Sequence, residues 1–244
     1  MNPSLENESR ISEARIEDFE NRFFAHIRLL LDQGYLAMGK NDCWQKNEET
    51  ISGDLREAID SILDDPSESW MSCYQVENEK PVQQHWRPKA ERTREGKSRQ
   101  KIDLELSTAE KIPRRRFSIE AKLLRDSHSI SAYVGDSGIG CFVNGEYARD
   151  ENAAGMAGYI QTRTLQDWTS GIEEKMEEKR KEIRLVSSPA WGQTSHQVAS
   201  ASVMASEHGR IDSLRNIDLL HFFLDFRKQA GSDQKREEAA SQPC

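Results

Sequence analysis

An aspartate and a Glu-x-Lys triplet, each inside an apolar stretch, are the residues of this chain whose types and spacing point to chemistry. Asp103 lies between Ile102 and Leu104, and Glu120 and Lys122 belong to the stretch RFSIEAKLL. Residues i and i+2 of a β-strand share a face, so Glu120 and Lys122 project together, and a hairpin partner can bring Asp103 beside them. Two carboxylates and one ammonium group would then converge.

Such a group of charges favours a divalent metal ion. Two close carboxylates repel each other unless a cation lies between them, and hard cations such as Mg²⁺, or Mn²⁺ in its place, prefer oxygen ligands. The metal lowers the pKa of a bound water and stabilises charge on a phosphate under attack, while a neighbouring lysine can hold or deprotonate that water. The residues therefore predict phosphodiester hydrolysis, with Asp103, Glu120 and Lys122 as catalytic residues.

The elements that position these residues can be read from apolar periodicity. Strands are predicted at 99–106 and 116–124, with a polar and basic hairpin loop between them. A helix is predicted over 47–65, where Glu48 extends the apolar stripe of Ile51, Leu55 and Ile59. The remaining predictions are a helix at 11–33, a strand at 71–79, a loop with a short strand at 133–147, a long helix at 152–185, and strands at 195–204 and 216–226.

The Asp of one strand and the Glu-x-Lys of the next resemble the signature of the PD-(D/E)XK nuclease superfamily, which has the restriction-endonuclease-like fold. The matching residues are Asp103, Glu120 and Lys122, with Ile102 in place of the proline. The resemblance spans roughly residues 45–226. It implies an α/β fold, a central mixed β-sheet flanked by α-helices, in the order helix, three-stranded antiparallel meander, helix and further strand.

The resemblance also implies a fuller set of metal ligands. A glutamate of the first core helix often joins the site, and the match is Glu48 or, failing that, Glu49; we favour Glu48 because it lies on the apolar stripe. The backbone carbonyl of Ala121 is a further ligand, so that the implied set is Glu48, Asp103, Glu120 and Ala121. Glu105 shares a strand face with Asp103 and is either a further member of the site or a surface charge.

Charge is segregated along the chain. The net charge of −8 alone argues against a nucleic-acid partner, but residues 85–125 hold 13 Lys and Arg against 6 Asp and Glu. Basic side chains beside the two catalytic strands could neutralise phosphates, although a solvated hairpin explains them equally well. The predicted nucleic-acid-binding residues are Arg99, Lys101, Arg114, Arg115, Arg116 and, on the predicted long helix, Gln161.

Composition limits the other classes. No stretch approaches the ~18 apolar residues of a membrane span and the first residues lack the apolar segment of a secretory signal, so we expect a cytoplasmic protein with no membrane partner. The four cysteines form no C-x-x-C pair, which argues against a zinc ribbon. We expect a disordered N-terminus at 1–10, one nuclease-like domain at 11–227 and a disordered tail at 228–244.

These observations predict a Mg-dependent nuclease, and they favour a DNA endonuclease of restriction, phage defence or repair. A homodimer is a further expectation, because a double-strand break made with one metal site per chain often requires two chains. Two alternatives stay open. One is a nuclease-like fold that has lost turnover and only binds nucleic acid or a protein; the other is a helix-mediated interaction protein in which the motif is a coincidence.

Overall fold

The computed structural model describes residues 3–39, 42–81, 101–109, 115–191, 202–212 and 214–228, with the backbone alone for 3–18. The helices are α1 (Pro3–Ala37), α2 (Glu48–Asp64), α3 (Ser127–Val134), α4 (Ile139–Val143) and α5 (Leu165–Glu178), and two 3₁₀ turns are η1 (Cys43–Gln45) and η2 (Met71–Cys73). The strands are β1 (Tyr74–Pro81), β2 (Lys101–Thr108), β3 (Arg116–Leu124), β4 (Ala153–Ile160), β5 (Ser202–His208) and β6 (Ile217–Asp225).

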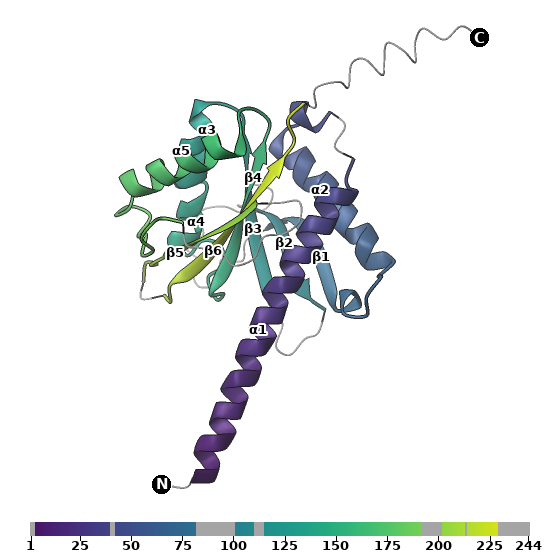
Figure 1. The fold of residues 1–244 in the computed structure, drawn as a ribbon, viewed down its shortest axis with the longest axis vertical. Helices are drawn as coiled ribbons and strands as arrows, with labels where there is room; N and C mark the ends of the chain where they lie inside the picture. Colours follow the sequence, from purple (N-terminus) through teal and green to yellow (C-terminus); the bar gives the residue numbers. More distant parts are fainter. Residues whose placement is uncertain are drawn as a thin grey trace, which may run out of the picture.

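The six strands form one mixed sheet in the order β1-β2-β3-β4-β6-β5. β1, β2 and β3 are an antiparallel meander, β3, β4 and β6 are mutually parallel neighbours, and β5 pairs antiparallel with β6 at the edge. Helices α1 and α2 lie to one side of the sheet, and α3 and α5 lie to the other (Figure 1). The prediction of an α/β fold with a mixed sheet flanked by helices is confirmed at this level.

The two faces of β3 belong to different parts of the core. Phe117, Ile119 and Ala121 are buried among apolar residues of α1 and α2. Leu124 packs instead against the cluster that α3, α4 and α5 contribute. Because side chains alternate along a strand, Glu120 and Lys122 project from the face opposite to Ile119 and Ala121.

Helix α2 forms as the sequence predicts. The side chain of Asn47 caps it by accepting a hydrogen bond from the Thr50 amide at 2.8 Å. Ile51, Leu55 and Ile59 are fully buried on one face. The first turn therefore starts at Glu48, whose side chain is carried at the edge of the packed face.

The helix predicted at 11–33 is longer in the structure. α1 begins at Pro3, so helical backbone occupies most of the segment that we expected to be a disordered N-terminus, and its N-terminal half extends beyond the sheet (Figure 1). Of the predicted tail, residues 229–244 lie outside the described residues. Among the helices that the structure describes, none combines the length and the apolar character needed to cross a membrane.

The predicted long helix at 152–185 is wrong in its first part. Ala153–Ile160 is the central strand β4, buried at every position, and only Leu165–Glu178 is helical. A parallel strand buried on both faces is apolar throughout and shows no alternation, so its pattern does not differ from that of a buried helix. Gly158 lets the neighbouring side chains pack closely, because a Cβ there would lie 2.8 Å from Cδ1 of Leu124 and that side chain would have to shift. The segment 133–147, expected as loop and strand, instead contains the end of α3 and all of α4.

Candidate active site

The antiparallel ladder between β2 and β3 stops before the end of β3, and beyond it carboxylate side chains accept hydrogen bonds from the amides of β3. Its last pair is Leu104 with Ile119. Beyond that point the amide of Ala121 donates to Oδ2 of Asp103 at 2.7 Å, and the amide of Leu123 donates to Oε2 of Glu48 at 2.8 Å. The diverging strands thus open a gap into which Asp103 of β2 and Glu48 of α2 both reach.

The ammonium group of Lys122 lies among three oxygen atoms. It is 2.6 Å from Oε1 of Glu120, 2.7 Å from the carbonyl oxygen of Ala121 and 3.3 Å from Oε1 of Glu48. Asp103 joins this group through its bond to the Ala121 amide. The structure therefore brings together the four predicted metal ligands and the predicted catalytic residue Lys122.

The choice between Glu48 and Glu49 is decided by their positions. Glu48 contacts both Lys122 and Leu123, whereas Glu49 is exposed on the next position of the helix. A hydrogen bond with Glu79 on β1 raises the pKa of Glu49. Glu49 thus belongs to the helix surface facing β1, and Glu48 is the glutamate of the site.

Burial dominates the electrostatics of the site. Burial raises the pKa of Glu120 above its ordinary value, and the neighbouring Lys122 ammonium offsets part of the rise. Burial also raises the pKa of Asp103, against the hydrogen bond from the Ala121 amide. For Lys122, burial lowers the pKa, but the carboxylates of Glu120 and Glu48 outweigh it and the pKa lies above the ordinary value.

The donor atoms fit a hard divalent cation in chemistry. Oε2 of Glu120 is buried and receives no hydrogen bond from a donor of the described residues, which is costly for a carboxylate oxygen unless a cation or water meets it. Asp103, Glu48 and the Ala121 carbonyl supply further oxygen ligands of the kind that Mg²⁺ and Mn²⁺ prefer. As the side chains stand, no three His, Cys, Asp or Glu of the described residues are arranged around one metal position. The Lys122 ammonium lies between Glu120 and Glu48 instead.

Gln161 has a different place from the one predicted. It follows β4 rather than lying on a helix, and it is buried. Its amide nitrogen donates to the carbonyl oxygens of Cys43 at 2.6 Å and Lys46 at 2.8 Å, and its oxygen accepts from Nε of Arg125 at 2.8 Å. All these bonds are internal, so Gln161 holds the segment that leads into Glu48 and does not face solvent.

A second internal hydrogen bond connects α2 to the sheet, and it was not predicted. Ser52 and Tyr159 are both buried, and their hydroxyl oxygens are 2.9 Å apart. Ser52 lies one helical turn after Glu48, and Tyr159 lies on β4. A serine on the apolar face of α2 is the one signal in the sequence that could have indicated this contact.

Three predicted nucleic-acid-binding residues have acidic partners within the chain. Lys101 pairs with Glu79 at 2.5 Å, and Arg115 pairs with Glu20 of α1 at 3.0 Å. Arg116 lies 4.0 Å from Glu105. Arg99 and Arg114 lie outside the described residues.

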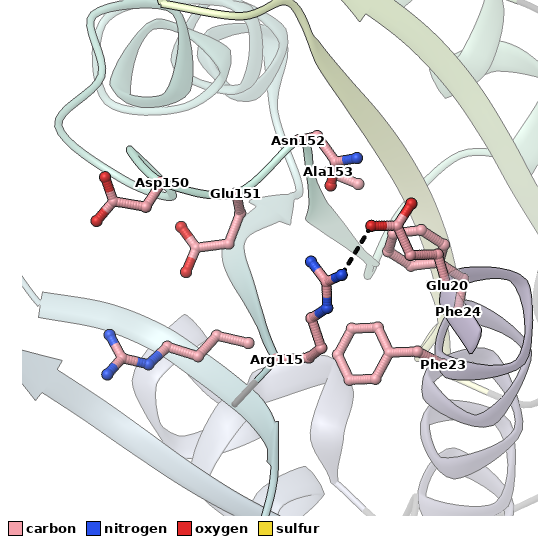
Figure 2. Close-up of a pocket in the computed structure, with 9 residues that line it drawn as sticks. Glu20, Phe23, Phe24, Arg115, Asp150, Glu151, Asn152 and Ala153 are labelled. Carbon is pink, nitrogen blue, oxygen red and sulfur yellow. Dashed lines mark ion pairs between the residues drawn. The ribbon is translucent and has the colours of Figure 1, made fainter. Parts of the chain in front are cut away.

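Arg115 and Arg116 also lie away from the carboxylates, because they precede or begin β3 whereas Lys122 is near its end. They line a separate pocket of about 260 Å³ together with Phe23, Asp150 and Glu151. Figure 2 shows Arg115 extending past Phe23 toward Glu20, with Asp150 and Glu151 on the opposite wall. This placement does not bring the two arginines to the candidate active site.

Glu105 was expected to be either a surface charge or a further member of the candidate active site, and the structure places it in neither position. It is buried and lies 2.7 Å from the ammonium group of Lys80 on β1. Its position on the same face as Asp103 is as predicted, but it serves an ion pair between two strands.

Comparison with models of known protein families, with curated proteins and with solved structures gave no match to this chain.

Proposed function

We propose that this protein is a metal-dependent nuclease of the PD-(D/E)XK type that hydrolyses phosphodiester bonds of DNA. The observation that carries the proposal is the convergence of Asp103, Glu120 and Glu48 around Lys122, with one buried oxygen of Glu120 that no donor of the described residues meets. The order α2, β1, β2, β3, α3, β4 supports it, because it follows the restriction-endonuclease-like core that the motif implies.

The proposed cofactor is Mg²⁺ or Mn²⁺, held by Asp103, Glu120, the Ala121 carbonyl and Glu48. When bound, such an ion supplies a Lewis acid that activates water and stabilises charge on the phosphate. The backbone amides of Ala121 and Leu123 hold the carboxylates of Asp103 and Glu48 in fixed orientations. Lys122, released from Glu120 and Glu48, is placed to orient the attacking water and to donate a hydrogen bond to a phosphate oxygen.

Cleavage of plasmid DNA in Mg²⁺ or Mn²⁺ tests the proposal. Asp103→Asn, Glu120→Gln and Lys122→Met should each reduce the rate by at least about 100-fold, since each removes a ligand or the proton donor. Glu178→Gln is the matched control, because Glu178 is an exposed carboxylate of α5 that pairs with Lys175. Circular dichroism of each variant checks the fold. Full activity in all three site variants would contradict the proposal.

The same preparation tests the other expected properties. An RNA substrate compared with DNA defines the substrate class, and sedimentation with and without DNA tests the proposed homodimer. A cytoplasmic role in restriction, phage defence or repair belongs to the same proposal and follows from the resemblance.

A second candidate function is nucleic-acid binding without turnover. The observation in its favour is that the Lys122 ammonium already contacts Glu120, Glu48 and the Ala121 carbonyl, so a cation offsets part of the negative charge of the site without a metal. DNA binding that persists while no metal supports cleavage is the outcome that this candidate predicts.

A further inference from the structure

Two arginines stand on neighbouring loops at the carboxyl ends of β3 and β4. Arg125 follows β3 directly, and Arg163 follows β4 by a few residues; both are exposed. Two hydrogen bonds join these loops. Oγ1 of Thr162 donates to the carbonyl oxygen of Arg125 at 2.6 Å, and the backbone amide of Gln161 donates to the carbonyl oxygen of Leu124 at 3.0 Å.

The guanidinium group of Arg125 is held from two sides. Its Nε donates to Oε1 of Gln161 at 2.8 Å, and Nη2 lies 3.4 Å from the carbonyl oxygen of Lys46. Gln161 is buried and is itself fixed by the carbonyl oxygens of Cys43 and Lys46. Arg125 is therefore oriented before any ligand arrives, which lowers the entropy lost on binding.

This position is next to the candidate active site. Lys46, which touches Arg125, precedes Glu48 by two residues, and Arg125 follows Leu123 by two residues. The amide of Leu123 donates a hydrogen bond to Oε2 of Glu48 at 2.8 Å. Arg125 thus lies close to Glu48, through both Lys46 and Leu123.

Arg125 and Arg163 also differ from their neighbours in charge pairing. Within the part of the chain that the structure describes, neither forms an ion pair, although Arg163 lies over the ring of Trp168 at 5.1 Å. Two other basic residues of this edge are neutralised: Lys46 pairs with Asp54 at 2.6 Å, and Arg227 pairs with Asp225 at 2.6 Å.

The carboxylates close to the two arginines already serve as helix caps. Asp126 accepts from the amides of His128 and Ser129 at the start of α3, and Asp167 accepts from Thr164 at the start of α5. Arg163 helps to lower the pKa of Asp167 after its bonds to Thr164, so some of the charge of Arg163 is offset. The guanidinium groups keep free donors toward solvent.

We propose that Arg125 and Arg163 bind backbone phosphates of the polynucleotide on either side of the bond that the site cleaves. This inference rests on the proposed nuclease function. A guanidinium group offers a planar pair of donors that matches phosphate oxygens, and two of them beside one metal site fit a chain of phosphates better than a single small anion. They replace Arg115 and Arg116 as the principal phosphate contacts, because those two are paired at the other end of β3.

Salt dependence of DNA binding tests this proposal without requiring cleavage. A fluorescent duplex is titrated with protein in EDTA at several salt concentrations, and the slope of log affinity against log salt counts the phosphates contacted, about 0.9 per contact. Arg125→Gln and Arg163→Gln should each reduce the slope by about 1 and weaken binding by about tenfold at ~0.1 M salt. Lys175→Gln, which removes one partly exposed positive charge from the last turn of α5, is the control and should leave the slope unchanged.

The outcomes separate the two levels of inference. If the wild-type protein binds DNA, and both arginine variants keep its slope and affinity as Lys175→Gln does, the phosphate assignment is wrong while the nuclease proposal stands. If the wild-type protein neither binds nor cleaves DNA or RNA, the proposed function fails and the phosphate assignment fails with it. Urea denaturation of Arg125→Gln, compared with wild type, confirms that an altered slope does not come from unfolding.

Discussion

Asp103 and Glu48 bind two amides that are two residues apart on the same edge of β3, those of Ala121 and Leu123. In a complete sheet those amides would pair with a neighbouring strand, but β2 has already diverged from β3 at this point. The carboxylates thus satisfy backbone donors and at the same time gather beside Glu120 and Lys122. Unfinished strand pairing is what creates the site, and it couples the geometry of the carboxylates to the backbone.

The first prediction concerns Lys122, whose ammonium group lies where it competes with a metal for Glu120 and Glu48. Lys122→Met should bind Mn²⁺ about tenfold more tightly than wild type while losing cleavage. Two charges about 4 Å apart interact by roughly 4 kcal/mol at an effective dielectric of 20, so removal of part of this repulsion is enough for a tenfold change. Titration calorimetry with Mn²⁺ measures the affinity.

Lys175→Met is the control for this measurement, since it removes an ammonium group that pairs with Glu178 on the surface of α5. Its Mn²⁺ affinity should equal that of wild type. Weaker Mn²⁺ binding by Lys122→Met than by the control would show that Lys122 helps to hold the metal and would contradict the competition.

The second prediction concerns the bond between Ser52 and Tyr159, which links the first turns of α2 to β4. Tyr159→Phe should lower the free energy of unfolding by about 1–3 kcal/mol, because it leaves the buried Ser52 hydroxyl without its partner. The double variant with Ser52→Ala should be more stable than the sum of the two single losses implies. Urea denaturation of the four proteins gives the coupling energy, and strict additivity would contradict a direct bond.

The features of the fold and of the candidate site that could be predicted are those that depend on residues close together in the sequence. Asp103, Glu120 and Lys122 were identified because period two and apolar neighbours define a strand face, and those signals lie within a few residues. Glu48 could be preferred over Glu49 because helix periodicity is equally local. The same patterns predicted the strands and the hairpin between the second and third, and the resemblance implied the antiparallel meander that the structure shows.

The failures occur where tertiary context overrides the pattern. β4 reads AAGMAGYI, a run rich in helix-forming residues, and it becomes a strand because it lies between β3 and β6 with both faces covered. Gln161 was consequently placed on a helix surface. Nothing near it in the sequence indicates Cys43 and Lys46, its partners from a distant segment. Likewise the basic stretch identified Arg115 and Arg116, but their acidic partners are distant in sequence.

The third prediction concerns Gln161 as a positioning residue for Glu48. Gln161→Glu replaces a donor by a carboxylate facing the carbonyl oxygens of Cys43 and Lys46, and it should lower the free energy of unfolding by about 2–4 kcal/mol. Gln161→Leu, which removes the polar atoms without adding charge, should cost less. Thermal or urea denaturation measures both.

If Gln161 positions Glu48, Gln161→Leu should also change the affinity for a metal ion. Where the protein remains folded, its Mn²⁺ affinity should fall about threefold to tenfold, since the segment before Glu48 loses its anchor. Thr162→Ala, which loses only the bond to the Arg125 carbonyl, is the control. Unchanged Mn²⁺ binding by folded Gln161→Leu would limit Gln161 to a purely structural role.

The last prediction concerns a buried chain of hydrogen bonds on the face of the sheet that α3, α4 and α5 cover. Nδ1 of His208 lies 2.8 Å from the carbonyl oxygen of Ile183, which can only accept, so Nδ1 carries the proton. Nε2 of His208 then accepts from the Ser206 hydroxyl at 2.8 Å, and Ser206 accepts from Nε2 of His221 at 2.7 Å. Nδ1 of His221 is left to accept from Tyr133 at 2.9 Å. This arrangement gives every polar atom of the chain a partner with both imidazoles neutral.

Burial lowers the pKa of His208 to about 4 and that of His221 well below its ordinary value. Unfolded histidine takes up a proton near pH 6.5, so between about pH 6.5 and 4 the unfolded chain binds more protons than the folded protein, and stability falls as the pH falls. Each histidine contributes up to about 1.4 kcal/mol per pH unit to this loss. Urea denaturation at pH 7 and pH 5 should show it, and His208→Gln should reduce the difference by the share of one histidine. Nitrogen-15 NMR gives a check that does not depend on the stability of the variant. A His208 ring that carries protons on both nitrogens, and is therefore positively charged, at pH 5.5 in the folded protein would refute the prediction.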